Sequence, residues 1–128
     1  MGPVAPRERI VLVDANALFT AARLHLDLLK ELKEAAPGWT AVVPGSVVRE
    51  LEVVGRRKFA REARAMAERL PLLENEGRGD RAILAAARAG PARAVLTNDR
   101  ALRAQLRKAG VPVLYVRGKA RLALDGAL

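Results

Sequence analysis

The chain contains 128 residues with a formal net charge of +9, no cysteine and only four aromatic side chains. This length fits one domain, the absence of cysteine excludes disulfides and thiolate metal sites, and no apolar run reaches the roughly 18 residues that span a bilayer. The basic balance either favours a polyanionic partner or reflects a compositional habit, since 18 of the 23 basic residues are arginine. We expect a cytoplasmic domain with no membrane segment. With so few aromatics for base stacking, it would hold a nucleic acid mainly by its phosphates.

Strand-like and helix-like segments alternate along the chain. After a loose lead-in at residues 1–7, the continuous apolar run that ends Arg9–Val13 predicts a strand buried on both faces. Further strands are expected at 41–43, 71–74 (a short edge strand), 94–96 and 111–116, and a basic tail at 117–124 could add one more. Helices are expected at 17–36 with a possible break at 20–23, at 47–54 with Ser46 as its N-cap, and at 59–70, 80–89 and 98–109. The alternation predicts an α/β fold, a single domain with a central parallel sheet of about five strands and helices on both faces.

Two aspartates follow apolar strands almost directly. Asp14 comes immediately after the first strand, and Asp99 follows the strand at 94–96 through Thr97 and Asn98. In open α/β sheets, ligands bind beyond the carboxyl ends of the strands, so neighbouring strands of this kind would place two carboxylates at one crevice. The alternative is that Asp14 or Asn16 only caps the next helix. Thr97 or Asn98 could cap the later helix, which would leave Asp99 free for another role.

Two helical acids are expected to face inward. At about 100° per residue, Glu50 falls between Val53 and Val54 on the apolar side of its helix, and Asp80 shares the stripe of Ile83. A carboxylate facing the interior is costly unless it is paired or holds a cation. The alternatives are that Glu50 is a surface-edge residue paired with arginine and that Asp80 is only a helix N-cap.

Four carboxylates at one crevice would need a counter-charge. Two unit charges about 4 Å apart interact by about 1 kcal/mol in water and by about 4 kcal/mol at an effective dielectric of 20. Oxygen ligands without histidine or cysteine partners suit Mg²⁺ or Mn²⁺ rather than zinc, and His25 is the only histidine. A divalent metal in a basic protein points to phosphodiester hydrolysis by a metal-activated water.

Four segments carry a resemblance to PIN-domain ribonucleases. They are Val-Asp-Ala-Asn at 13–16, Val-Pro-Gly-Ser-Val-Val-Arg-Glu-Leu at 43–51, Asp-Arg-Ala-Ile-Leu at 80–84 and Leu-Thr-Asn-Asp-Arg-Ala-Leu at 96–102. Each is weak alone, but their order and spacing cover nearly the whole chain. Within the family, the chain is most similar to archaeal single-domain proteins related to the PIN endonuclease of small-subunit rRNA processing, whose end resembles residues 110–122.

The resemblance implies an endoribonuclease that depends on Mg²⁺ or Mn²⁺ and acts on RNA, with an rRNA precursor as one candidate substrate. A homodimer is expected on the same ground. Many relatives carry two adjacent aspartates where this chain has Asp80-Arg81, so one possible auxiliary acid is missing. The residues expected at the site are the catalytic and metal-binding acids Asp14, Glu50, Asp80 and Asp99, with Asn16, Thr97 and Asn98 as supporting polar residues.

Basic residues gather in two stretches outside these motifs. The turn Arg56-Arg57-Lys58 follows the Glu50 helix and contains no apolar side chain that packing in the core would explain. We therefore expect it to contact RNA phosphates. Arg100 and Arg103 come just after Asp99 and are expected to reach phosphate as well. The alternative is a solvated basic face of the kind common in arginine-rich chains.

Other functions remain open at this point. A toxin ribonuclease would share the fold and would bind an antitoxin partner, and a non-catalytic assembly factor would use only the basic surface. A receiver domain is also a parallel α/β fold with an acidic Mg²⁺ pocket. It is disfavoured because Ala15-Asn16 stands where its adjacent acidic pair belongs, and because no suitable phospho-acceptor is present.

Overall fold

A computed structural model of the chain describes residues 8–118 and 121–128. The lead-in expected at residues 1–7 lies outside this range, as do residues 119–120 of the predicted basic tail. Within the described ranges, no helix combines the length and apolar character needed to cross a membrane.

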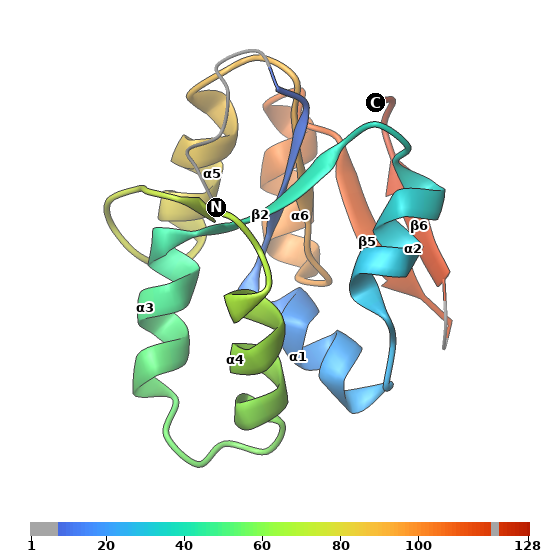
Figure 1. Cartoon of the computed structure of the whole chain (residues 1–128). Coiled ribbons are helices and arrows are strands. Elements are labelled where there is room, and N and C mark those ends of the chain that lie inside the picture. The colour runs from blue at the N-terminus through green and yellow to red at the C-terminus, as the bar shows by residue number, and fades with distance from the viewer. Residues whose placement is uncertain (1–7, 119–120) are drawn as a thin grey trace.

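A six-stranded sheet forms the centre of the molecule, in the spatial order β3-β2-β1-β4-β5-β6 (Figure 1). All neighbouring strands are parallel except β6, which pairs antiparallel with β5 at one edge. The expected parallel sheet is therefore confirmed. Its six strands include the short edge strand β3 and the additional strand β6 from the basic tail. The strands are β1 (Ile10–Val13), β2 (Thr40–Pro44), β3 (Leu72–Leu73), β4 (Arg93–Leu96), β5 (Val113–Arg117) and β6 (Arg121–Asp125).

Strand β1 lies in the middle of the sheet, as its apolar run predicts. It pairs with β2 on one side and β4 on the other, and all four of its residues are at most 1% exposed. Just beyond its end, the backbone N–H of Asp14 donates to the carbonyl of Leu96 (N···O 3.0 Å). The strand ends that precede Asp14 and Asp99 are thus neighbours, as the predicted crevice requires.

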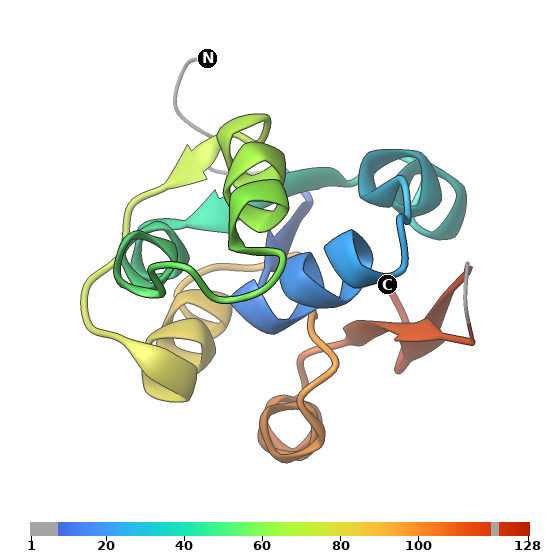
Figure 2. The same cartoon turned by 90° about the horizontal axis from the view of Figure 1, so that it is seen from below.

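Helices cover both faces of the sheet. In Figure 1, α5 and α6 lie behind it, while α1, α2 and α4 lie in front, and Figure 2 shows this arrangement from below. One contiguous hydrophobic core joins these helices to the strands. The helices are α1 (Ala15–Arg23), α2 (Leu28–Ala35), α3 (Gly45–Val53), α4 (Ala60–Glu68), α5 (Gly79–Arg88) and α6 (Arg100–Lys108).

Two predictions about helix boundaries are wrong. The helix expected at 17–36 is two helices, and the chain leaves helical structure at residues 24–27 rather than at 20–23. There Asp27 accepts a hydrogen bond from the Lys30 backbone (3.3 Å) and starts α2 as its N-cap. Ser46 does not cap α3, because that helix already begins at Gly45 after Pro44, which has no side chain able to cap.

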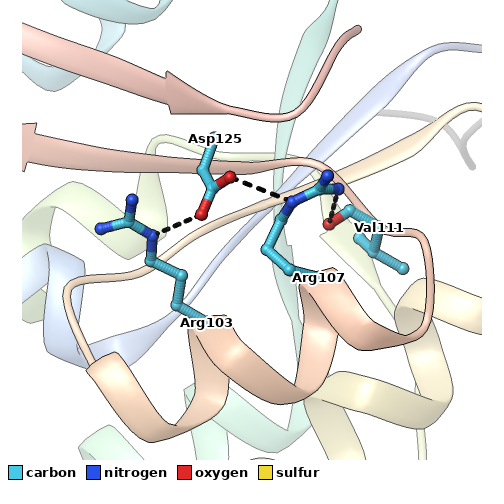
Figure 3. A network of polar contacts seen from close by, with 4 residues as sticks. All are labelled: Arg103, Arg107, Val111 and Asp125. Carbon is cyan, nitrogen blue, oxygen red and sulfur yellow. Dashed lines mark hydrogen bonds and ion pairs between the residues drawn. The ribbon is translucent and has the colours of Figure 1, made fainter.

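An ion-pair network fastens the last strand to α6 (Figure 3). Asp125 of β6 accepts from Nε of Arg103 (2.8 Å) and of Arg107 (3.1 Å), and Arg107 also donates to the Val111 carbonyl (3.2 Å). The Arg103 guanidinium lies 3.8 Å from the ring centroid of Tyr115. The hydrogen bond from Arg103 holds the pKa of Asp125 below its ordinary value. This network gives Arg103 a structural role on the side of β5 and β6.

Candidate functional site

A small cavity of about 140 Å³ lies beyond the carboxyl ends of β1 and β4. Its walls come from α1, α3, α5 and the turn before α6, so residues distant in sequence meet here. The cavity brings together all four acids that the sequence analysis predicts. Its lining includes Asp14, Asn16, Phe19, Ser46, Glu50, Arg57, Asp80 and Asp99.

Asp14 is the buried acid of the site. It is 8% exposed, its Oδ1 accepts from the backbone N–H of Ala15 (2.9 Å), and its Oδ2 accepts from the Thr97 hydroxyl (2.8 Å). The pKa of Asp14 is raised to about 6, mainly by burial and to a smaller extent by the charges of Glu50 and Asp80, which together outweigh the lowering by the bonds from Thr97 and Ala15. Asp14 therefore caps α1, as one interpretation of the sequence held, and also faces the cavity.

Asp99 also caps a helix, which corrects the expectation that Thr97 or Asn98 would do so. Its Oδ1 accepts from the Leu102 backbone (3.0 Å), so α6 begins at Arg100 rather than at residue 98. The Thr97 hydroxyl donates to Asp14 and accepts from the Asp99 N–H (3.1 Å), and Asn98 is engaged elsewhere. Asp99 is half-buried and lines the cavity from the α6 side.

Glu50 and Asp80 line the cavity but are exposed, so the prediction that both face the interior is wrong. In α3 Val47 and Leu51 are buried, whereas Val53, on the other side of Glu50 around the helix, is 82% exposed. Glu50 therefore lies at the rim of that buried side. Asp80 is the second residue of α5, one turn before the buried Ile83, and partial burial together with the charge of Asp99 raises its pKa.

The supporting polar residues divide into two groups. Thr97 is fully buried against Asp14, and Asn16 lines the cavity while its Oδ1 accepts from the Asn98 N–H (2.9 Å). The Asn98 side chain instead bonds both the N–H and the carbonyl of Val116 (2.9 and 3.0 Å) and so extends the pairing of β4 with β5. Its contribution is to hold the turn rather than to line the cavity.

Asn75 belongs to the supporting structure of the site, and the sequence analysis missed it. Its Oδ1 accepts from the Ser46 N–H (2.8 Å), and its Nδ2 donates to the Ser46 hydroxyl (2.9 Å) and to the Ala82 carbonyl (3.4 Å). One amide therefore caps α3 from outside and joins it to α5, the two helices that carry the exposed acids. Asn75 lies in a loop without hydrophobic periodicity, so no sequence signal marks it.

The predicted RNA-binding residues occupy different positions. Arg57 reaches the wall of the acidic cavity, while Lys58 lines a hollow beside it. Arg56 and Arg100 are exposed and line neither space. Arg103 takes part in the network around Asp125 rather than in the cavity. Their contact with RNA stays a prediction.

The ligand atoms that the cavity offers are of the type that Mg²⁺ and Mn²⁺ prefer. All four carboxylates offer oxygen, the ligand that these cations prefer, and in the described ranges none of the four forms an ion pair with a basic side chain. The raised pKa of Asp14 is what a buried carboxylate shows when its hydrogen bonds, here from Thr97 and Ala15, do not outweigh the cost of burying its charge. As the side chains stand, no three acid or histidine groups among the described residues form a cluster that could hold an ion unaided. Mg²⁺ commonly takes only one or two carboxylates and completes its shell with waters and substrate phosphate, so the set remains suitable.

Comparison with known proteins agrees with the fold. A search of curated proteins found no match. Among solved structures, the chain is similar to the one titled "Structure of the PIN domain endonuclease Utp24", with a TM-score of 0.81 and 25% sequence identity over 93% of this chain and 92% of that one. The family model described as "PIN like domain" matches residues 11–119, which include all four acids of the cavity. The chain therefore belongs to the PIN-like domain family.

Proposed function

We propose that this protein is an endoribonuclease that depends on a divalent metal, Mg²⁺ or Mn²⁺. The observation that carries the proposal is the meeting of Asp14, Glu50, Asp80 and Asp99 in one cavity of a strongly basic protein. Membership of the PIN-like domain family and the likeness to the endonuclease Utp24 support the same reaction class.

Asp14 is the residue best prepared to hold the metal, with Glu50, Asp80 and Asp99 as further ligands directly or through water. When bound, the metal would lower the pKa of a water and neutralise charge on the phosphate. The bonds from Thr97 and Ala15 fix the orientation of the Asp14 carboxylate. The side chain would therefore lose little conformational entropy on binding a cation.

The remaining groups of the cavity have distinct tasks. Glu50 and Asp80 are exposed at the rim, where a carboxylate can accept a proton from water or orient it for attack. The Arg57 guanidinium also lines the cavity and, among the residues that the structure describes, provides the one positive charge of the lining, suited to a phosphate oxygen. The chain thus offers anionic groups for the metal and a cationic group for the substrate.

A role in rRNA maturation is the finer proposal, supported by the resemblance of residues 110–122 and by the likeness to Utp24. A toxin ribonuclease with an antitoxin partner and a non-catalytic RNA-binding factor are the competing proposals, and a homodimer remains an expectation. A small antitoxin gene beside this one would favour the toxin.

The test is a cleavage assay on structured and single-stranded RNA with Mg²⁺, with Mn²⁺ and with EDTA. We expect internal cleavage that EDTA abolishes and that Asp14→Asn reduces by orders of magnitude, because the nucleophile is a metal-activated water. RNA binding without cleavage under any of these conditions would refute the proposal and favour the non-catalytic factor.

A further inference from the structure

A second hollow adjoins the acidic cavity and shares part of its wall. Asn16, Phe19 and Arg57 line both spaces, so the two adjoin at this shared wall. Beyond this shared wall the second hollow is lined by Thr20, Arg23, Lys58 and Phe59. We call the two adjoining spaces together the groove; residues of α1 and of the turn that precedes α4 line both of its parts.

The charge of this groove changes sign along its length. The cavity at one end contains four carboxylates, whereas the hollow at the other end contains Arg23, Arg57 and Lys58 and no acid. In the described part of the chain, these three cations form no ion pair with a carboxylate. Three cations without a partner acid, beside a site proposed for phosphodiester chemistry, have the charge that suits further phosphates.

Arg57 is held in place at the boundary of the two spaces. Its guanidinium lies 3.8 Å from the ring centroid of Phe19, which is itself buried in α1 at 7% exposure. Its backbone N–H donates to the Val54 carbonyl (3.3 Å), and its carbonyl accepts from the Ala60 N–H (3.0 Å). A planar guanidinium stacked on a ring loses less freedom on binding phosphate than a free side chain does.

The turn that carries Arg57 and Lys58 is itself fixed. Arg64 donates to the carbonyls of Leu51 and Gly55 (3.3 and 3.4 Å), which ties the end of α3 to α4. Phe59 adopts a left-handed backbone conformation (φ 69°), which is uncommon for a bulky residue and persists only where the surroundings hold it. The basic end of the groove is therefore a formed surface rather than a loose charged loop.

We propose that the hollow lined by Arg23, Arg57 and Lys58 holds the backbone phosphates of a single RNA strand on one side of the bond to be cut. This rests on the proposed function, because the acidic cavity fixes where the scissile phosphate lies. The RNA is then bound asymmetrically, with several phosphate contacts on one side of the scissile phosphate and few on the other.

The experiment compares three variants in two measurements, with Arg61→Ala as the matched control. Arg61 is exposed on α4 and lines neither space, and its replacement removes the same single charge as Arg57→Ala. Affinity for a single-stranded uridine oligonucleotide is measured in EDTA over a range of salt concentrations. Arg57→Ala should weaken binding about tenfold and reduce the salt slope by about 0.7, while Arg61→Ala should change both far less.

Phe19→Leu distinguishes binding in the groove from unspecific electrostatic attraction of RNA to a basic protein. It leaves the net charge unchanged but removes the ring beneath the guanidinium, so binding should weaken while melting confirms that the protein remains folded. Equal losses for Arg57→Ala and Arg61→Ala, with no effect of Phe19→Leu, would overturn the inference and leave the proposed function untouched.

The second measurement uses cleavable RNA with uncharged methylphosphonate linkages on one flank of the cut site or on the other. The inference expects one flank to be sensitive and the other not, and expects Arg57→Ala to reduce that sensitivity while Arg61→Ala leaves it unchanged. Equal sensitivity of both flanks would overturn it. Binding that depends on Arg57 in a protein that cuts no RNA with either metal would refute the proposed function while supporting the groove as an RNA site.

Discussion

Replacing Asp14 by asparagine in the metal-free protein should raise stability at neutral pH and leave it unchanged in acid. The pKa of Asp14 rises from its ordinary 3.8 to about 6 in the folded protein. Below about pH 3.8 both states hold the proton and the carboxyl imposes no cost. As the pH rises from about 3.8 through 6, the unfolded chain has released the proton while the folded protein still holds it, so the folded state loses relative stability over this range. At 1.36 kcal/mol per pKa unit, the cost reaches about 3 kcal/mol above pH 7.

Asparagine resembles the protonated acid in size and shape, and its carbonyl can still accept from Ala15. We therefore expect similar unfolding free energies for both proteins at pH 4, and a gain of up to about 3 kcal/mol for Asp14→Asn at pH 7.5. Urea denaturation in EDTA at the two pH values measures these unfolding free energies. Taking the difference between wild type and variant at each pH removes the contributions of titrating groups that the two proteins share. The reasoning would be refuted if the unfolding free energies of the two proteins changed equally between pH 4 and pH 7.5, or if the variant were the less stable one at pH 7.5. Either result would show that the folded protein stabilises the charged Asp14 carboxylate without a cation.

Three further predictions concern the surroundings of the site. Replacing residues 56–58 by alanine should weaken RNA binding similarly across sequences, with the salt slope falling by about 0.7 for each phosphate that the protein no longer neutralises; an unchanged slope would contradict phosphate binding. Asn75→Ala removes the two short bonds to Ser46 and should cost about 1 to 3 kcal/mol of unfolding free energy. It should also lower kcat, and Asn75→Asp, which retains the acceptor oxygen, should restore part of that loss. A normal kcat in Asn75→Ala would show that Asn75 serves folding alone. Asp125→Asn should lower the melting temperature slightly in low salt and less in high salt, with RNA cleavage unchanged; a large loss of cleavage would show that β6 contributes to the site.

The sequence predicted the parts of the fold that depend on local pattern. The run that ends Arg9–Val13 can be buried on both faces only in a central strand, and the turn after it had to place Asp14 at the end of the sheet. The helical wheel was less reliable for Glu50, because it assumes that the whole apolar side of α3 is covered. In the structure Val53 points away from the packed face of that helix, which contains Val47 and Leu51, and the acid is at the rim of this face.

Contacts between distant loops could not be predicted in this way. The capping of α3 by Asn75 joins residues 29 positions apart through a side chain that has no pattern around it. The role of Asp99 was misjudged for a similar reason. Its freedom depended on whether Thr97 was available to cap α6, and the Thr97 hydroxyl is taken by Asp14, 83 positions away. The four acids could be named from local sequence, but the arrangement that supports them follows from tertiary structure.

Calorimetric titration of Mn²⁺ at pH 6, in buffers of different ionisation enthalpy, tests most directly that the acidic cavity holds a divalent cation. Near pH 6 about half of the Asp14 carboxyls carry a proton, and a metal ligand must give its proton up, so binding should release roughly half a proton per ion. We expect saturable binding with this proton release in the wild-type protein, and weaker binding without it in Asp14→Asn. Absence of binding, or equal affinity of the two proteins with no difference in proton release, would contradict a cation site at Asp14.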